Sequence, residues 1–239
     1  MKNLWWRALG PVTLISLLLT GWLGLWVTPR AQQQGDFARL VYLHPAEAWV
    51  GIYLSFGTAV IASGLYLWPR TRRASLDLVA ASAMEVSVVF LVLTLITGAI
   101  WGRPTWGVWW AWDARLTSTA VMAVLALGYL AYRYSFDDPM RRAQRSAILA
   151  LISAVNVPII HFSVVWWKTL HQGATVLTPG ASIKIHGIMA WTMLLSFIAF
   201  TLCFVWMTRV RYLIARQAQE DSRTRLTSAI AARQSEGGV

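Results

Sequence analysis

Long apolar runs alternate with short polar segments along this chain. Six runs of about 20 residues can be drawn, at roughly 9–27, 49–68, 78–100, 116–132, 147–167 and 187–208. A helix of about 20 residues crosses the roughly 30 Å of hydrocarbon in a bilayer. Six open strands would leave backbone groups unpaired in lipid. The pattern therefore predicts an all-α integral membrane protein with six transmembrane helices.

Composition supports a membrane protein. The chain is 57% apolar and 13% charged, with a mean hydropathy of +0.52, whereas soluble domains are about half apolar and a quarter charged. The first run follows a basic start, as in a signal peptide, but it is about 19 residues long and no A-x-A site follows it. We interpret it as a retained first span. Cys203 is the single cysteine, which excludes an intramolecular disulfide and a thiolate metal site.

Basic residues fall mainly in alternate polar segments. The N-terminus, 70–73, 133–145 and the segment from Arg209 onward hold 15 of the 21 Lys and Arg residues, and the intervening loops hold 6. Cytoplasmic loops carry this excess, so both termini are expected to be cytoplasmic. The chain is therefore predicted to consist of a six-span domain over residues 1–211 and a cytoplasmic tail over residues 212–239. The tail is expected to form a short or frayed helix. Because the positive charge lies in clusters between spans, a nucleic-acid partner is not expected.

The loop between the third and fourth spans, at 101–116, is expected on the outer, periplasmic side. It lies in WGRPTWGVWWAWDARLTS, which holds five of the 15 tryptophans within 12 residues, broken by glycines, a proline and charges. This punctuation argues against a buried helix and favours an aromatic shelf at the membrane surface, suited to a large, flat, hydrophobic ligand with polar ends. The alternative is an ordinary interfacial belt, but a belt distributes its tryptophans over many helix ends.

All four histidines fall in the outer half on this topology: His44, His161, His171 and His186. Neutral imidazole is an axial ligand of haem iron. Two imidazoles from different loops would clamp a macrocycle at the membrane surface, and His44 and His171, each beside a span with polar neighbours, are the best pair. His161 lies among apolar residues and is interpreted as a hydrogen-bonded structural histidine, and His186 as a cap of the sixth span.

Other function classes receive less support. A cytochrome b-like electron-transfer subunit would need histidines at two depths, and none lies in the inner half. A channel would show broken spans in matching halves, and Pro158 gives only one break. A cofactor-free structural subunit of a transporter complex stays open. Glu85, in the inner half of the third span, is assigned no role in haem binding. No nucleophile–base set, phosphate loop or ATP motif indicates an enzyme.

The tryptophan segment resembles the signature of the haem-handling "WWD" membrane proteins. NVPIIHFSVVWWKTLHQG, at 156–173, and VYLHPAEAW are similar to two further segments of one branch, the cytochrome c maturation protein C family, also called haem exporter protein C. The resemblance covers roughly residues 30–210. One departure is that Pro45 follows His44 directly, which predicts extended backbone geometry at this histidine.

The resemblance implies specific site residues. His44 and His171 would be the axial ligands of haem b. The haem-presenting surface would comprise Trp101, Trp106, Trp109, Trp110, Trp112, Asp113 and Arg115. Arg103, Lys168 and Lys184, together with Arg115, are candidate partners of the haem propionates or, alternatively, interfacial anchors.

The resemblance also implies a function. Proteins of this family hold haem at the outer face of the bacterial inner membrane and deliver it to a periplasmic haem chaperone for c-type cytochrome biogenesis. The implied partners are that chaperone, the ATPase and membrane subunits of an ABC transporter, a small single-span adaptor subunit and membrane lipid. None of these partners is visible in the sequence.

Overall fold

The computed structural model describes residues 4–31, 34–171 and 185–236, and these are almost entirely helical. The α-helices are α1 (Leu4–Trp22), α2 (His44–Ala48), α3 (Phe56–Leu67), α4 (Ala74–Trp106), α5 (Ala114–Tyr134), α6 (Pro139–Ser153), α7 (Asn156–Trp166) and α8 (Gly187–Glu236). π-Helical segments at Leu23–Val27 and Trp49–Ser55 and a 3-10 helix at Asp36–Tyr42 link them. Six helical stretches are long and apolar enough to cross a membrane, which confirms the predicted number.

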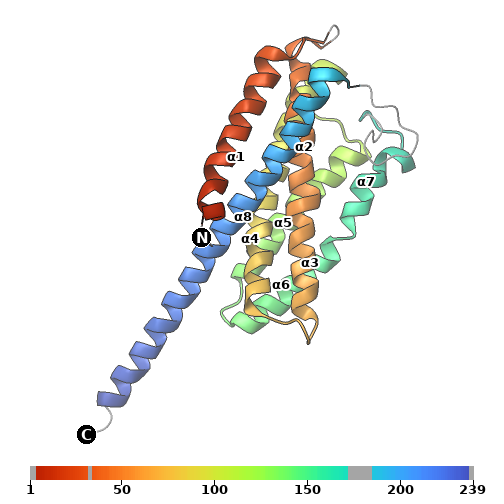
Figure 1. Cartoon of the computed structure of the whole chain (residues 1–239). Helices are drawn as coiled ribbons and strands as arrows, with labels where there is room; N and C mark the ends of the chain where they lie inside the picture. Colours follow the sequence, from red (N-terminus) through yellow and green to blue (C-terminus); the bar gives the residue numbers. More distant parts are fainter. Residues whose placement is uncertain (1–3, 32–33, 172–184, 237–239) are drawn as a thin grey trace.

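The helices pack as one elongated bundle (Figure 1). Its core lies where α3, α4 and α5 meet, around the fully buried side chains of Phe56, Met84, Met122 and Tyr129. The helix α1 packs against α8 at the edge of the bundle. Many large apolar side chains of α1 remain exposed, including Trp5, Leu14, Ile15 and Leu18.

The spans begin and end at different places from those expected. The third span runs through Gly102 and Pro104 to Trp106, so packing of this 33-residue helix overrides local propensity. The fifth span is broken into α6 and α7. Pro158 lies in the first turn of α7, where its missing N–H removes no helical bond. Asn156 donates from Nδ2 to the carbonyl of Ser118 at 2.8 Å and ties α7 to α5.

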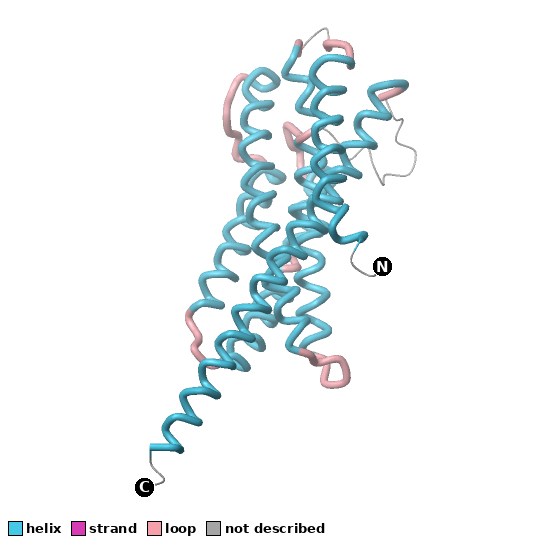
Figure 2. Tube along the Cα trace, turned by 60° about the vertical axis from the view of Figure 1, so that its left-hand side comes forward, coloured by secondary structure: helices cyan, strands magenta, loops and turns pink. Residues whose placement is uncertain are grey.

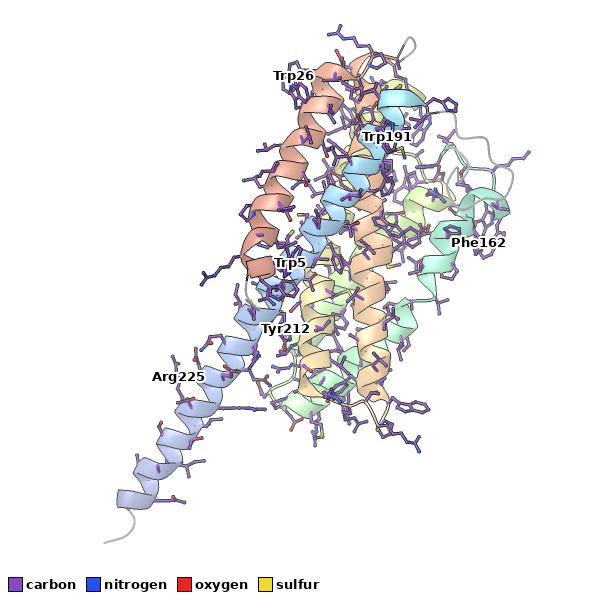
Figure 3. All side chains as sticks on the ribbon, in the orientation of Figure 1. Trp5, Trp26, Phe162, Trp191, Tyr212 and Arg225 are labelled. Carbon is purple, nitrogen blue, oxygen red and sulfur yellow. The ribbon has the colours of Figure 1, made fainter. Side chains whose placement is uncertain are left out.

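The polar tail is not a separate short helix. The last span continues without interruption as α8, which is 50 residues long. Its C-terminal part extends beyond the rest of the bundle (Figure 2) and carries the ion pair Arg216–Glu220 at spacing i,i+4. Arg225 lies on this projecting part, and Tyr212 lies where α8 is still beside the bundle (Figure 3). Contacts between residues at spacing i,i+4 stabilise a helix that is exposed to water. This explains why α8 continues through its polar part.

Two ion pairs connect helices. Asp77 of α4 and Arg133 of α5 form a bidentate, buried pair with N–O distances of 2.5 and 2.6 Å. Glu85 of α4 pairs with Arg211 of α8. Glu85 stood out in the sequence as an ionisable residue within a span, but its partner Arg211 could not be predicted, because it is distant along the chain.

The connections gather at two ends of the bundle. The start of α1, the end of α8 and the turns at 68–73 and 135–138 lie toward one end (Figure 1). The segment 28–43, the loop 107–113 and the segment that follows α7 lie toward the other. The predicted histidine pair and tryptophan segment therefore share one end.

Candidate functional site

His44 is the first residue of α2 and packs directly against α4. Its Nδ1 lies 3.1 Å from the hydroxyl oxygen of Thr97. A Cβ added at Gly98 would lie 2.9 Å from the ring carbon Cε1, so the ring touches a surface that only glycine provides. The expectation of extended geometry at His44 is wrong, because this residue begins a helix with Pro45 in the first turn, where proline is tolerated.

His171 lies in the segment that follows α7, and Asp113 holds this segment in place. One carboxylate oxygen of Asp113 accepts from the backbone N–H of Leu116 at 2.8 Å and caps α5. The other accepts from the N–H of Leu170, next to His171, at 3.1 Å. Thr169 donates its hydroxyl to the carbonyl of His171 at 3.1 Å. Asp113 therefore acts on the site through the backbone.

The two histidines, separated by more than half of the chain, meet at one place. The centroids of the His44 and His171 rings lie 6.4 Å apart, with an angle of 37° between their planes. Two imidazoles that bind one metal ion from opposite sides place their centroids about 6 Å apart, because a metal–nitrogen bond is about 2 Å and the nitrogen lies roughly 1 Å from the centroid. The observed spacing fits shared ligation of one iron.

Two tryptophans flank this pair. The indole of Trp101 contacts the ring of His44 edge-on at 6.0 Å, and that of Trp106 lies 6.3 Å from the ring of His171. Gln34 accepts from the Trp101 indole N–H at 3.0 Å, which ties the first connection of the bundle to the end of α4. Both tryptophans lie on α4 and not in a loop, so the expected loop at 101–116 is wrong at both ends.

The remaining tryptophans lie in the short segment between α4 and α5. Gly107 ends α4 in the left-handed conformation, with φ of +79°, so this glycine turns the chain. Trp109 and Trp112 are 60% and 84% exposed. The rings of Trp110 and Trp112 meet edge-to-face with centroids 5.6 Å apart. The shelf thus has an inner pair on the histidines and two exposed rings, Trp109 and Trp112, whereas Trp110 is partly buried.

The basic candidates occupy different places. Arg115 donates to the carbonyls of Ile160 and His161 at 3.3 and 3.0 Å, which commits its guanidinium to joining α5 and α7. Arg103 bonds the carbonyl of Gly107, and Lys168 is exposed after α7. Lys184 lies outside the described residues.

The other two histidines have different surroundings. His161 hydrogen-bonds through Nδ1 to the Tyr53 hydroxyl at 2.9 Å, in agreement with a structural histidine. His186 is exposed and directly precedes α8.

Two polar residues next to His44 were missed by the sequence analysis. Glu47 of α2 is only 5% exposed, and its Oε2 accepts from the Thr97 hydroxyl at 2.6 Å. The available signal was a carboxylate three residues after His44, one helical turn away within an apolar stretch. Thr97 carried no such signal.

Comparison with known proteins identifies the family of this chain. Residues 1–225 match the family described as "Heme exporter protein C". The chain belongs to the Heme exporter protein C family. It is 39% identical to the "Heme exporter protein C" of Bradyrhizobium diazoefficiens, over 84% of this chain and 73% of the relative. It is also 39% identical to that of Escherichia coli K12, over 78% and 74%.

A plant relative is more distant. The "Putative cytochrome c biosynthesis ccmC-like mitochondrial protein" of Arabidopsis thaliana is 32% identical, over 81% of this chain and 72% of the relative. The match to the Heme exporter protein C family includes His44, the tryptophan segment and His171. The resemblance drawn from the sequence is therefore confirmed at the level of the family, and the six long apolar helices make this chain a multi-pass membrane protein.

Proposed function

We propose that this protein binds haem at the outer face of the membrane, between His44 and His171, and delivers it to a periplasmic haem chaperone for c-type cytochrome biogenesis. The observation that carries the proposal is the 6.4 Å separation of these two imidazole rings, with Trp101 and Trp106 against them. Membership of the Heme exporter protein C family supports haem as the cargo.

The arrangement suits a cargo that must be held and then released. Haem b supplies an iron with two axial positions, which the imidazoles of His44 and His171 would fill. Trp106 and the exposed rings of Trp109 and Trp112 offer contact area on one side without enclosing the macrocycle. Part of the porphyrin edge then remains accessible to an acceptor protein.

The haem propionates need cationic partners. Arg103 and Lys168 are exposed near the shelf and remain candidates, as does Lys184 from the sequence. The contacts of Arg115 with α7 favour a supporting role, and Asp113 similarly supports the His171 segment.

The distribution of charge supports the orientation. The cluster 70–73, the start of α6 and the polar part of α8 lie at the end of the bundle away from His44, and α1, which carries Arg7, begins about half-way toward that end. The positive-inside rule assigns that end to the cytoplasm. The histidine pair and the tryptophan segment would then lie at the periplasmic face of the bacterial inner membrane. The exposed apolar side chains of α1 would then face lipid.

The proposed function involves other proteins. In this chain, residues 1–211 would form the haem-handling domain and residues 212–239 the cytoplasmic part. This subunit would work as a non-enzymatic component beside the ATPase and membrane subunits of an ABC transporter and a small single-span adaptor. Energy for transport would come from the ATPase, since this sequence contains no phosphate-binding loop.

An absorption spectrum of the purified protein tests the haem proposal. We expect a bis-histidine haem spectrum in the wild type. His44→Ala and His171→Ala should each lose most of the bound haem, or retain haem that no longer shows the six-coordinate spectrum. His186→Ala, which changes an exposed histidine outside the pair, is the matched control. A bis-histidine spectrum unchanged in either ligand variant would refute that ligand assignment.

A further inference from the structure

A buried carboxylate lies behind His44. Glu47 is 5% exposed and lies in α2, one turn after the histidine. The hydroxyl oxygen of Thr97 lies 2.6 Å from Glu47 Oε2 and 3.1 Å from His44 Nδ1. The three groups therefore form a continuous chain from carboxylate to hydroxyl to imidazole.

The direction of these hydrogen bonds follows from the acceptors around Thr97. Its hydroxyl carries one proton, and the carboxylate of Glu47 at 2.6 Å and the carbonyl of Leu93 at 2.9 Å both accept closer than His44 Nδ1. The proton of Thr97 therefore points away from the histidine, and a lone pair of its oxygen faces the ring. This lone pair can accept a proton from Nδ1, and the backbone carbonyl of Thr94 is a further acceptor beside the ring. The arrangement around Thr97 therefore favours the neutral imidazole that carries its hydrogen on Nδ1.

We propose that Glu47, acting through Thr97, is a positioning residue that fixes His44 as its Nδ1–H tautomer and so presents Nε2 as the iron ligand. The inference deepens the proposed function and rests on it, because it concerns how one ligand of the haem is prepared. Metal-binding histidines are commonly oriented through their second ring nitrogen in this way, often by a carboxylate.

An electronic consequence follows from this arrangement. A carboxylate that draws the Thr97 proton makes the hydroxyl oxygen a stronger acceptor, which increases the basicity of the imidazole. A more basic ligand stabilises the oxidised iron relative to the reduced iron. The chain of Glu47, Thr97 and His44 therefore lowers the midpoint potential of the bound haem.

The first experiment needs no haem. The full-length protein, labelled with 15N-histidine and purified in detergent, is studied by NMR at alkaline pH, and the His44 signal is assigned with His44→Ala. We expect His44 to be protonated at Nδ1 in the wild type. In Thr97→Val, the fraction of His44 protonated at Nε2 should be larger than in the wild type. A wild-type His44 protonated at Nε2 would overturn the proposal.

The second experiment is a redox titration of the haem-loaded protein. Glu47→Gln and Thr97→Val should raise the midpoint potential and weaken haem retention by roughly 10- to 100-fold, whereas Thr97→Ser should retain the wild-type potential. Thr94→Val is a matched control one turn away, because it removes a hydroxyl that bonds its own helix at Phe90 and leaves in place the Thr94 backbone carbonyl, which is a hydrogen-bond partner of His44. Glu85→Gln, at the Arg211 contact, controls for loss of a membrane carboxylate.

The outcomes separate the two proposals. Unchanged potentials in Glu47→Gln and Thr97→Val, in protein whose haem still depends on His44, would overturn this inference alone. Haem binding that does not depend on His44 would overturn the ligand assignment first, and this inference with it. A shift of equal size in Thr94→Val would show a general packing effect and also contradict the role of Glu47.

Discussion

At the scale of single residues, the position of His44 depends on Gly98, which has no side chain. Gly98 leaves room for the imidazole against the backbone of α4, and Thr97 beside it holds Nδ1. The ring is thus fixed from two sides by consecutive residues of one helix. An imidazole held in this way keeps its orientation, and in the proposed site this would favour haem binding because less freedom is lost.

Replacing Gly98 with alanine tests this dependence. The new methyl group would lie 2.9 Å from His44 Cε1, so the ring must move, and we expect haem retention to fall at least about tenfold. The helix itself should gain a little stability from the substitution. Spectra and haem content of the purified variant are the measurements. Gly128→Ala, at a position with no atom within 4 Å of the added carbon, should bind haem normally, and equal loss in both variants would contradict the argument.

The sequence singled out the candidate ligands more readily than the residues that contact them. His44 and His171 stood out because imidazoles beside spans are chemically distinctive, and the structure brings them together. Thr97 could not be singled out, since a threonine in a span ordinarily bonds its own helix, as Thr94 does. Its second contact, with Glu47, depends on the packing of α2 against α4.

At the scale of elements, Asp113 links the start of α5 to the segment that carries His171. It caps the helix with one oxygen and holds the Leu170 N–H with the other. The aspartate of the tryptophan segment therefore connects this segment to the one that carries the second histidine.

Replacing Asp113 with alanine should have two effects. Loss of the cap should destabilise the protein by about 1 kcal/mol, and release of the Leu170 N–H should weaken haem retention through His171. Asp138→Ala removes the corresponding cap of α6 at the other end of the bundle, so it should show the first effect only. Thermal unfolding in detergent and haem content distinguish them. Normal haem content in Asp113→Ala would contradict the positioning role.

The helical elements followed from hydropathy, but their ends did not. The apolar pattern predicted six spans because length and composition are local properties, and six are present. It missed that α4 continues through Pro104 and that α8 continues to Glu236. Packing over a long helix and i,i+4 contacts decide those ends, and neither is visible in a window of hydropathy.

At the scale of the whole molecule, the connections of the bundle divide between two ends, and the positive charge gathers at one of them. The sequence anticipated this division from charge alone. The arrangement of spans around one another, with α1 against α8 and the core at α3, α4 and α5, could not be derived from it, because every span is apolar on most of its surface.

Labelling of single cysteines tests the orientation. Cys203 is the only natural cysteine, so a Cys203→Ser background allows Val108→Cys and Ser135→Cys to be compared, both at exposed positions in opposite turns. A membrane-impermeant maleimide should label the former in intact spheroplasts and the latter only after lysis. The reverse pattern would place the histidine pair on the cytoplasmic side.

The distance along the chain between the two histidines has a consequence for biosynthesis. The ribosome makes His44 early and His171 only after most of the bundle, a delay of roughly 6 to 25 s at about 5–20 residues per second. In the proposed site, the haem iron would have only one of its two imidazole ligands until then. The fold would thus delay haem binding until five of the spans have been made, so that a nascent chain that stalls earlier would lack the second ligand.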